Sequence, residues 1–188
     1  MSTDIMIDLE TLGTTADCVI LSIGAVAFDL DAYSVGGHTY YAVTSLESQP
    51  ARSINRDTLA WWTTQSPEAA AVLTHQPKQT ISSALDGLRV FVKEARETSG
   101  ALQVWSNGAD FDLPILNHAY SQCNIMAPWT PYSARCYRTY KNLPGARAVK
   151  AQRTGTRHNA LDDAIYQAHH LCAIHEALFM VPVQGDAA

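Results

Sequence analysis

The sequence has 188 residues, of which 47% are hydrophobic, enough for one compact domain with a full core. No apolar run approaches the roughly 18 to 20 residues that span a bilayer, and no basic stretch followed by an apolar one opens the chain, so we expect no membrane helix and no signal peptide. The net charge of -5 argues against a protein that coats long duplexes by charge alone. The four cysteines form no CxxC pair, which argues against structural zinc and favours reduced thiols in a cytoplasmic protein.

The N-terminal part of the chain predicts three strands. Residues 4–8 place apolar, partly β-branched side chains between two aspartates, which fits a short strand. Residues 18–28 are too apolar for an exposed edge and fit a strand buried on both faces. The Gly36-Gly37 pair ends a turn and leads into a third strand at residues 38–43. Together these segments predict an antiparallel meander.

Mainly helices are predicted in the rest of the chain. Pro67 and Pro114 each fit the first turn of a helix, where a missing amide donor is harmless. The predicted helices cover residues 55–65, 67–73, 82–95, 112–122, 134–143 and 159–179. We also predict a buried strand at residues 102–105, an irregular segment at 126–131, a mobile loop at 144–156 and a disordered tail at 182–188.

Two acids follow each other closely at the end of the first predicted strand. Asp8 and Glu10 are two residues apart, so the period of a strand places both on one face and Leu9 on the other. Like charges side by side are unfavourable unless a cation lies between them. The spacing alone fits either a structural role or a pair of metal ligands, and the position at the end of a buried strand favours the ligands.

The segment NGADFD joins a buried strand to a helix and carries two more acids. Either acid could cap the helix by accepting backbone N–H bonds. Asp110 fits the cap, and Asp112 fits a position in the first turn that points across the end of the sheet. The residues alone leave this choice open.

The segment RHNALDDA presents a similar choice. Asn159 is a good N-cap, and Asp162 lies three positions later, as in an imperfect capping box. His158 would then precede the helix, and Asp163 would project from its first turns. If the helix already included His158, Asp162 would instead share its face.

These acids could meet in one pocket only with cations, because like charges oppose each other's ionisation. Two bound Mg2+ or Mn2+ ions would resolve the conflict, and such a pair is a common clamp for cleaving a phosphodiester. Residues 113–161 contain no Asp or Glu but seven of the 13 basic residues. A solvated basic loop would have the same composition, but its position directly before His158 favours phosphate contacts.

Together, Asp8-x-Glu10, Asn107 with Asp112, and His158-x4-Asp163 resemble the DEDDh branch of the 3'-5' exonuclease superfamily. The sequence HNALDDA is close to that branch's His-x-Ala-x-x-Asp-Ala pattern. The forms NGADFD, WW followed by QSPE, and CYRT make the chain most similar to the group that contains T-even phage exodeoxyribonucleases and a mycobacterial 3'-5' exoribonuclease. The resemblance spans residues 4–175.

The resemblance implies an RNase H-like α/β fold, in which helices flank a central mixed five-stranded sheet of three antiparallel and two parallel strands. It also implies a single 3'-5' exonuclease domain at residues 1–181. It selects Asp112 over Asp110 and Asp163 over Asp162.

The same resemblance implies catalytic roles. His158 is the expected general base, a task that suits imidazole near neutral pH. The substrates would be single-stranded 3' ends of DNA or RNA, and the products nucleoside 5'-monophosphates. Some relatives form homodimers, although no apolar stripe here demands one. The expected ligands of two divalent metal ions, Mg2+ or Mn2+, are Asp8, Glu10, Asp112 and Asp163.

A second set of residues is expected to bind the substrate. Neighbouring residues on a helix point about 100° apart, so Trp61 and Trp62 cannot both face one core. One of the two, for which Trp61 is the candidate, would stack on a base. The alternative is that one tryptophan packs in the core and the other on the rim of the core. Arg138 and Arg157 are expected at phosphates. The resemblance adds Thr11, Leu12 and Gly13, which lie where relatives hold the sugar and base of the terminal nucleotide, and Asn107 as a further substrate-binding residue.

Two other functions are alternatives to an exonuclease. A catalytically weak or inactive nucleic-acid-binding relative would be expected to lack a ligand, and none is missing. A metal phosphatase or small-nucleotide hydrolase would share the metals and differ in substrate size. The choice between RNA and DNA stays open, because it depends on contacts near the 2'-hydroxyl.

Overall fold

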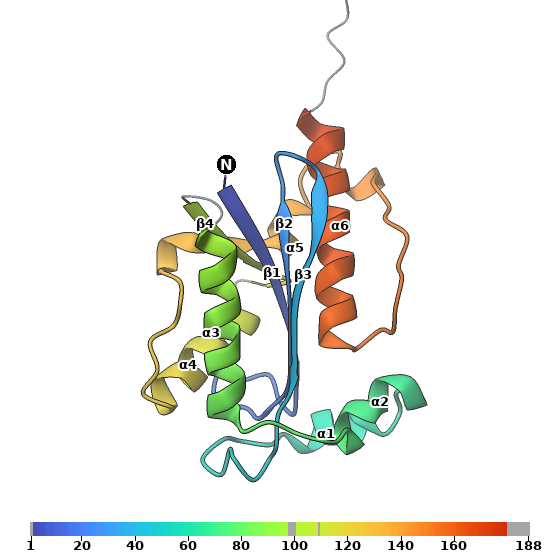
Figure 1. Ribbon diagram of the computed structural model, residues 1–188. Helices are drawn as coiled ribbons and strands as arrows, with labels where there is room; N and C mark the ends of the chain where they lie inside the picture. The colour runs from blue at the N-terminus through green and yellow to red at the C-terminus, as the bar shows by residue number, and fades with distance from the viewer. Residues whose placement is uncertain (1, 98–100, 109, 180–188) are drawn as a thin grey trace, which may run out of the picture.

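A five-stranded mixed sheet forms the centre of the molecule, in the order β3-β2-β1-β4-β5 (Figure 1). This computed structural model describes residues 2–97, 101–108 and 110–179. β1, β2 and β3 pair antiparallel, whereas β4 runs parallel to β1 and β5 parallel to β4. The strands are β1 (Ser2–Thr11), β2 (Ile20–Asp29), β3 (Ser34–Val43), β4 (Ala101–Ser106) and β5 (Ala134–Cys136). This is the sheet that the resemblance implied.

Helices cover both faces of the sheet. α3 and α4 lie on one face, α6 lies on the other, and α1 and α2 lie beyond one end (Figure 1). No helix in the described part of the chain is long and apolar enough to cross a bilayer. The helices are α1 (Arg56–Trp62), α2 (Pro67–Thr74), α3 (Ile81–Glu97), α4 (Asp112–Gln122), α5 (Tyr137–Tyr140) and α6 (Ala160–Phe179), with 3-10 turns at Pro131–Ser133 and Ala146–Ala148.

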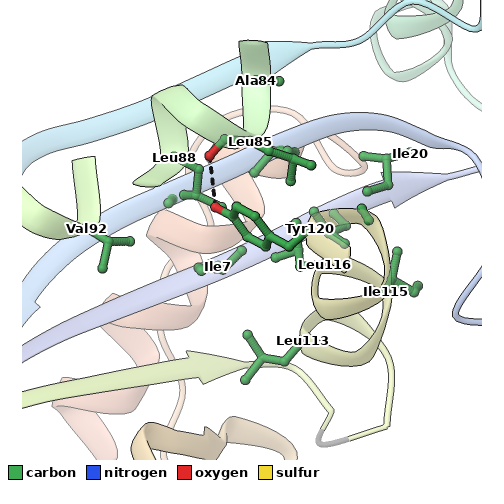
Figure 2. Close-up of a cluster of buried hydrophobic side chains, with 14 of the residues drawn as sticks. Ile7, Ile20, Ala84, Leu85, Leu88, Val92, Leu113, Ile115, Leu116 and Tyr120 are labelled. Atoms are coloured by element: carbon green, nitrogen blue, oxygen red, sulfur yellow. Dashed lines mark hydrogen bonds between the residues drawn. The ribbon is translucent and has the colours of Figure 1, made fainter. Parts of the chain in front are cut away.

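The main core lies between the sheet and the α3–α4 layer. Ile5, Ile7 and Leu9 point from β1 into this layer, where they meet the apolar faces of α3 and α4. Figure 2 shows the hydroxyl of Tyr120 donating to the carbonyl of Leu85, at 2.9 Å. Each fully buried aliphatic side chain contributes about 1.5–3 kcal/mol to the stability of this layer. The core therefore holds β1 rigidly in the middle of the sheet.

The opposite face of the sheet is covered by α6, which approaches closely because its inner residues are small. Ala164 and Ala168 are fully buried there beside Met6 of β1. In β2, a Cβ atom added to Gly24 would overlap the backbone of Ala160 and Leu161. The absence of a side chain at Gly24 thus lets the first turn of α6 rest directly on the sheet.

The segment at residues 134–143 departs from expectation. The predicted helix is wrong, because residues 134–136 form the edge strand β5 and only Tyr137–Tyr140 is helical. Pairing with β4 decides this, since Val104 lies opposite Ala134 and Ser106 opposite Cys136. Such long-range pairing overrides local propensity.

The predicted bounds of other elements differ less from those in the structure. The second strand begins at Ile20 rather than at residue 18, because Cys18 forms an isolated bridge with Ser53. The predicted loop at residues 144–156 includes the 3-10 turn Ala146–Ala148. The tail predicted from residue 182 lies outside the described residues.

Candidate metal-binding active site

The end of β1 carries the first two acids of the site. Asp8 and Glu10 share the face that α6 covers, and Leu9 between them packs into the core on the other face. Both acids are buried, with 9% and 7% of their surface exposed. Asp8 lies opposite Gly24 in the β1–β2 pairing, so the close approach of α6 to Gly24 brings the start of that helix beside Asp8.

Asp112 joins this pair from α4. It is the first residue of the helix, it is 1% exposed, and its Oδ1 accepts a hydrogen bond from the backbone N–H of Leu9 at 3.2 Å. Asp110 does not occupy the N-cap position, which is Phe111, and the side chain of Phe111 makes no capping hydrogen bond. Asp110 is exposed and lies 3.7 Å from Arg138 instead. The structure thus separates the two acids that the sequence left as alternatives.

The first turn of α6 supplies Asp163. Asn159 caps the helix, because its Oδ1 accepts from the N–H groups of Leu161 and Asp162 at 3.1 and 3.2 Å. Asp162 turns back toward the preceding segment and accepts from the N–H of Thr156 at 2.7 Å. Asp163 is 9% exposed, and its Oδ2 accepts a hydrogen bond from the backbone N–H of His158 at 3.0 Å.

His158 lies just before α6 with a φ of 60°, in the left-handed region that histidine tolerates better than most residues. This conformation brings its imidazole to Glu10 and Asp163, and one ligand atom from each of the three lies within 4.8 Å of the others. The three side chains could therefore hold a metal ion.

The acids are crowded enough to change their ionisation. Burial, followed by repulsion from Asp163 and Asp112, raises the pKa of Glu10 to about 8. Burial raises the pKa of Asp112 to about 7, against the opposing effect of backbone N–H groups. Burial, followed by repulsion from Asp112, also raises the pKa of Asp8, although Gln167 donates to its Oδ1 at 2.7 Å. Without cations, protons partly occupy this cluster at neutral pH.

Divalent cations fit this donor set. Carboxylate oxygens are the ligands that Mg2+ and Mn2+ prefer. Oδ2 of Asp112 is buried and has no hydrogen-bond partner in the described part of the chain, which leaves it free to coordinate. A buried acid with an unused oxygen is costly unless an ion or water engages it.

Two pockets meet at Leu9 and Glu10. The first, which we call the acidic pocket, has a volume of about 380 Å³ and contains Asp8, His158 and Asp163. The second, which we call the tryptophan pocket, has a volume of about 420 Å³. The tryptophan pocket is lined by Leu9, Glu10, Thr11, Gly13, Thr14, Asp57, Thr58, Trp61, Trp62 and Phe111.

The two tryptophans face different surroundings, as their adjacency predicted. Trp62 is buried, and its Nε1 donates to the carbonyl of Thr11 at 2.9 Å. Trp61 is 41% exposed and meets the ring of His158 edge-on, with centroids 4.8 Å apart. Trp61, which lines the tryptophan pocket, therefore contacts His158, which lines the acidic pocket.

The other predicted substrate residues differ in position. Thr11 and Gly13 line the tryptophan pocket, whereas the side chain of Leu12 is buried in an apolar cluster beside it. Asn107 lines the acidic pocket. Arg138 is exposed beside Gly108. Arg157 is exposed and is not among the residues that line either pocket.

The acidic pocket also contains residues that the sequence analysis did not select. Helical spacing could have indicated Tyr166, Gln167 and His170, which lie three, four and seven positions after Asp163 on α6. Arg153 gives no such signal, because it belongs to an irregular segment. Two further pocket residues, also missed, are Tyr137 and Lys141.

Residues 3–175 match the model of the Rv2179c-like 3'-5' exoribonuclease domain. The chain belongs to this family. Over 125 residues it is 30% identical to the exodeoxyribonuclease of Enterobacteria phage T4, a match that covers 60% of this chain and 53% of that protein. The chain therefore spans about half the length of this curated relative.

Three solved structures of nucleases share this architecture. Cell-death related nuclease 4 (CRN-4) superimposes with a TM-score of 0.62 at 13% identity, over 90% of this chain and 62% of that one. A full-length 3'-exonuclease gives 0.58 at 11% identity, over 93% and 80%. E. coli exonuclease I, solved in complex with a 5cy-dT13 oligonucleotide, gives 0.55 at 12% identity, over 96% and 42%. At these identities the likeness concerns the fold, and the predicted RNase H-like fold is confirmed.

Proposed function

We propose that this chain is a metal-dependent 3'-5' exonuclease that releases nucleoside 5'-monophosphates from single-stranded 3' ends. The convergence of Asp8, Glu10, Asp112, Asp163 and His158 at the end of β1 carries this proposal. Membership of a 3'-5' exoribonuclease domain family supports it. The full set of acids speaks against an inactive binding relative.

The four acids would hold two divalent ions, Mg2+ or Mn2+. Bound there, such ions activate a water and stabilise the charge on the leaving oxygen. Asp112 is held in place by the N–H of Leu9, and Asp8 by Gln167, so two of the ligands are oriented before any ion binds.

His158 would take the proton of the attacking water. Its imidazole lies at the rim of the acid cluster, is half-buried, and contacts the indole of Trp61. A base must lie within reach of the proton that it removes, and the position of His158 beside Glu10 and Asp163 supports this role.

The tryptophan pocket would receive the terminal nucleotide. It opens beside Glu10, and Trp61 and Phe111 give it aromatic walls on which a base can stack. The backbone at Thr11 and Gly13 borders it and could contact the sugar. A base in this pocket would leave its phosphate near the acidic pocket, where the chemistry takes place.

Both RNA and DNA are candidate substrates. The family model is described as an exoribonuclease domain, and the phage T4 relative is an exodeoxyribonuclease. The deciding contact is the one to the 2'-hydroxyl of the terminal sugar.

The first experiment is digestion of RNA and DNA oligomers of matched sequence, each labelled at the 5' end, with Mg2+ or Mn2+. We expect a ladder of products shortened from the 3' end, release of 5'-mononucleotides, and no digestion with EDTA. Activity that survives EDTA, or label released first as a mononucleotide, would contradict the proposal.

A matched pair of variants tests the metal ligands. Asp163→Asn should abolish digestion. Asp162→Asn should keep most of it, because the Asp162 carboxylate accepts from the N–H of Thr156 in the segment before α6. His158→Ala should bind Mn2+ and lose turnover. Substantial digestion by His158→Ala would place the general base elsewhere.

A further inference from the structure

Arg153 is a cation held inside the acidic pocket. Its guanidinium lies over the ring of Tyr166, 4.2 Å from the centroid, and donates to Oδ1 of Asp163. Its side chain is 27% exposed. Since both contacts come from α6, the guanidinium is held over the acids although Arg153 itself belongs to an irregular segment.

This contact competes with a metal ion for Asp163. Oδ2 of Asp163 already accepts from the backbone N–H of His158, so Arg153 occupies the remaining oxygen. A divalent ion and a guanidinium on the same carboxylate oxygen would repel each other. The N–H of His158 belongs to the backbone at the start of α6, whereas Arg153 is a long side chain. Arg153 is therefore the group that moves when an ion binds.

The charge balance of the pocket indicates where Arg153 goes. Four ionised carboxylates and two divalent ions cancel, so the negative charge of a bound phosphodiester has no partner among them. Arginine presents a planar fork of N–H donors that matches phosphate oxygens. Lys141 also lines the pocket, where its Nζ contacts Oδ1 of Asn107 at 3.4 Å and lies over the ring of Tyr137. Arg153, in contrast, contacts one of the acids directly.

We propose that Arg153 is a phosphate-binding residue that exchanges Asp163 for the terminal phosphate of the substrate when divalent ions bind. Before the ions arrive, Arg153 neutralises Asp163 and holds it in place. Afterwards, Tyr166 keeps the guanidinium at the edge of the pocket, where it meets the phosphate. This inference rests on the proposed function, because it places ions at the acids and a phosphodiester beside them.

Three variants test the exchange. Arg153→Met removes the charge and keeps a long side chain on Tyr166, and Arg153→Lys keeps the charge and loses the fork. Arg147→Met is the matched control, since Arg147 is an exposed cation of the same segment and is not among the residues that line the acidic pocket. The melting temperature of each variant shows that it is folded.

The first measurement is calorimetric titration with Mn2+ alone, at about pH 8. Arg153→Met should bind Mn2+ at least about threefold more tightly than the wild type, because the competing cation is gone. Arg153→Lys should stay near the wild type, as should Arg147→Met. The inference is overturned if Arg153→Met binds Mn2+ no more tightly than Arg147→Met does.

The second measurement is titration of the Mn2+-saturated protein with adenosine 5'-monophosphate. Arg153→Met should bind it about tenfold more weakly, which corresponds to the loss of a charged hydrogen-bond pair. The nucleotide affinity of Arg153→Lys should fall between those of the wild type and Arg153→Met. Unchanged nucleotide affinity in Arg153→Met also overturns the inference.

The two titrations separate this inference from the proposed function. If the wild type digests no oligomer but Arg153→Met shows both changes, the exonuclease is wrong and the role of Arg153 stands. If the wild type digests oligomers and Arg153→Met behaves like Arg147→Met, the exonuclease stands and the role of Arg153 is wrong.

Discussion

The indole of Trp61 meets the imidazole of His158 edge-on, with ring centroids 4.8 Å apart and an interplanar angle of 87°. The contact joins α1 to the segment that precedes α6. The contact suggests a second role for Trp61 in addition to the proposed stacking on a base, because the indole limits the orientations that the imidazole can adopt.

Replacing Trp61 should therefore affect turnover as well as substrate binding. An aromatic pair contributes about 0.5–1.5 kcal/mol, so Trp61→Ala should lower kcat by up to about tenfold. Trp61→Phe should retain most of the wild-type kcat. Steady-state digestion of an oligomer separates kcat from KM. A variant with wild-type kcat and a raised KM would leave Trp61 with base stacking alone.

Gly24→Ala should damage the fold and the site together. The added methyl group would overlap the backbone of Ala160 and Leu161, so the start of α6 must shift away from the sheet. Overpacking of this kind costs about 1–3 kcal/mol or more. Urea denaturation should show the loss of stability, and Mn2+ affinity should fall because Asp163 moves with the helix. Gly37→Ala is the control, since a Cβ atom there meets nothing within 4 Å.

Asp112→Asn and Asp110→Asn should differ sharply. Asparagine at 112 keeps an oxygen for the N–H of Leu9 but removes a buried charge, so the metal-free protein should be as stable as the wild type or more stable. Its Mn2+ affinity should fall at least about tenfold. Asp110 is exposed, so its variant should bind Mn2+ normally and change stability by less than about 1 kcal/mol. Equal Mn2+ affinities would remove Asp112 from the ligand set.

The metal-free protein should lose stability as the pH rises from about 5 to about 8. The folded-state pKa values of Glu10 and Asp112, about 8 and about 7, lie above the ordinary values of 4.5 and 3.8. Within this window the folded chain holds protons that the unfolded chain has released, so raising the pH favours unfolding.

Each of these groups contributes at most about 1.4 kcal/mol per pH unit. Urea denaturation in EDTA at about pH 6 and about pH 8 measures the loss. Adding Mn2+ at about pH 8 should reverse it, by about 2.7 kcal/mol at a hundredfold excess over Kd. Equal or greater metal-free stability at the higher pH would contradict the crowding of the acids.

The sequence predicted the strands and helices that carry the candidate site, because those elements have strong periodic patterns. The shared face of Asp8 and Glu10 could be predicted from the alternation of side chains along a strand. The position of Asn159 could be predicted from the preference of asparagine for the N-cap of a helix. The β5 strand could not be predicted, since three residues at an edge take their conformation from β4. Arg153 was missed for a similar reason, because its position depends on Tyr166 in another element. The role of Gly24 depends on Ala160, 136 positions further along the chain.

The central position of β1 restricts where the chain can change in length. Met6, Asp8 and Glu10 face α6, while Ile5 and Ile7 face the opposite layer. One residue inserted before Asp8 would reverse the faces on which these side chains lie. The acids would then point into the hydrophobic core under α3, and apolar side chains would point toward α6. Lengthening is therefore far better tolerated in the exposed turn between β2 and β3 than anywhere within β1.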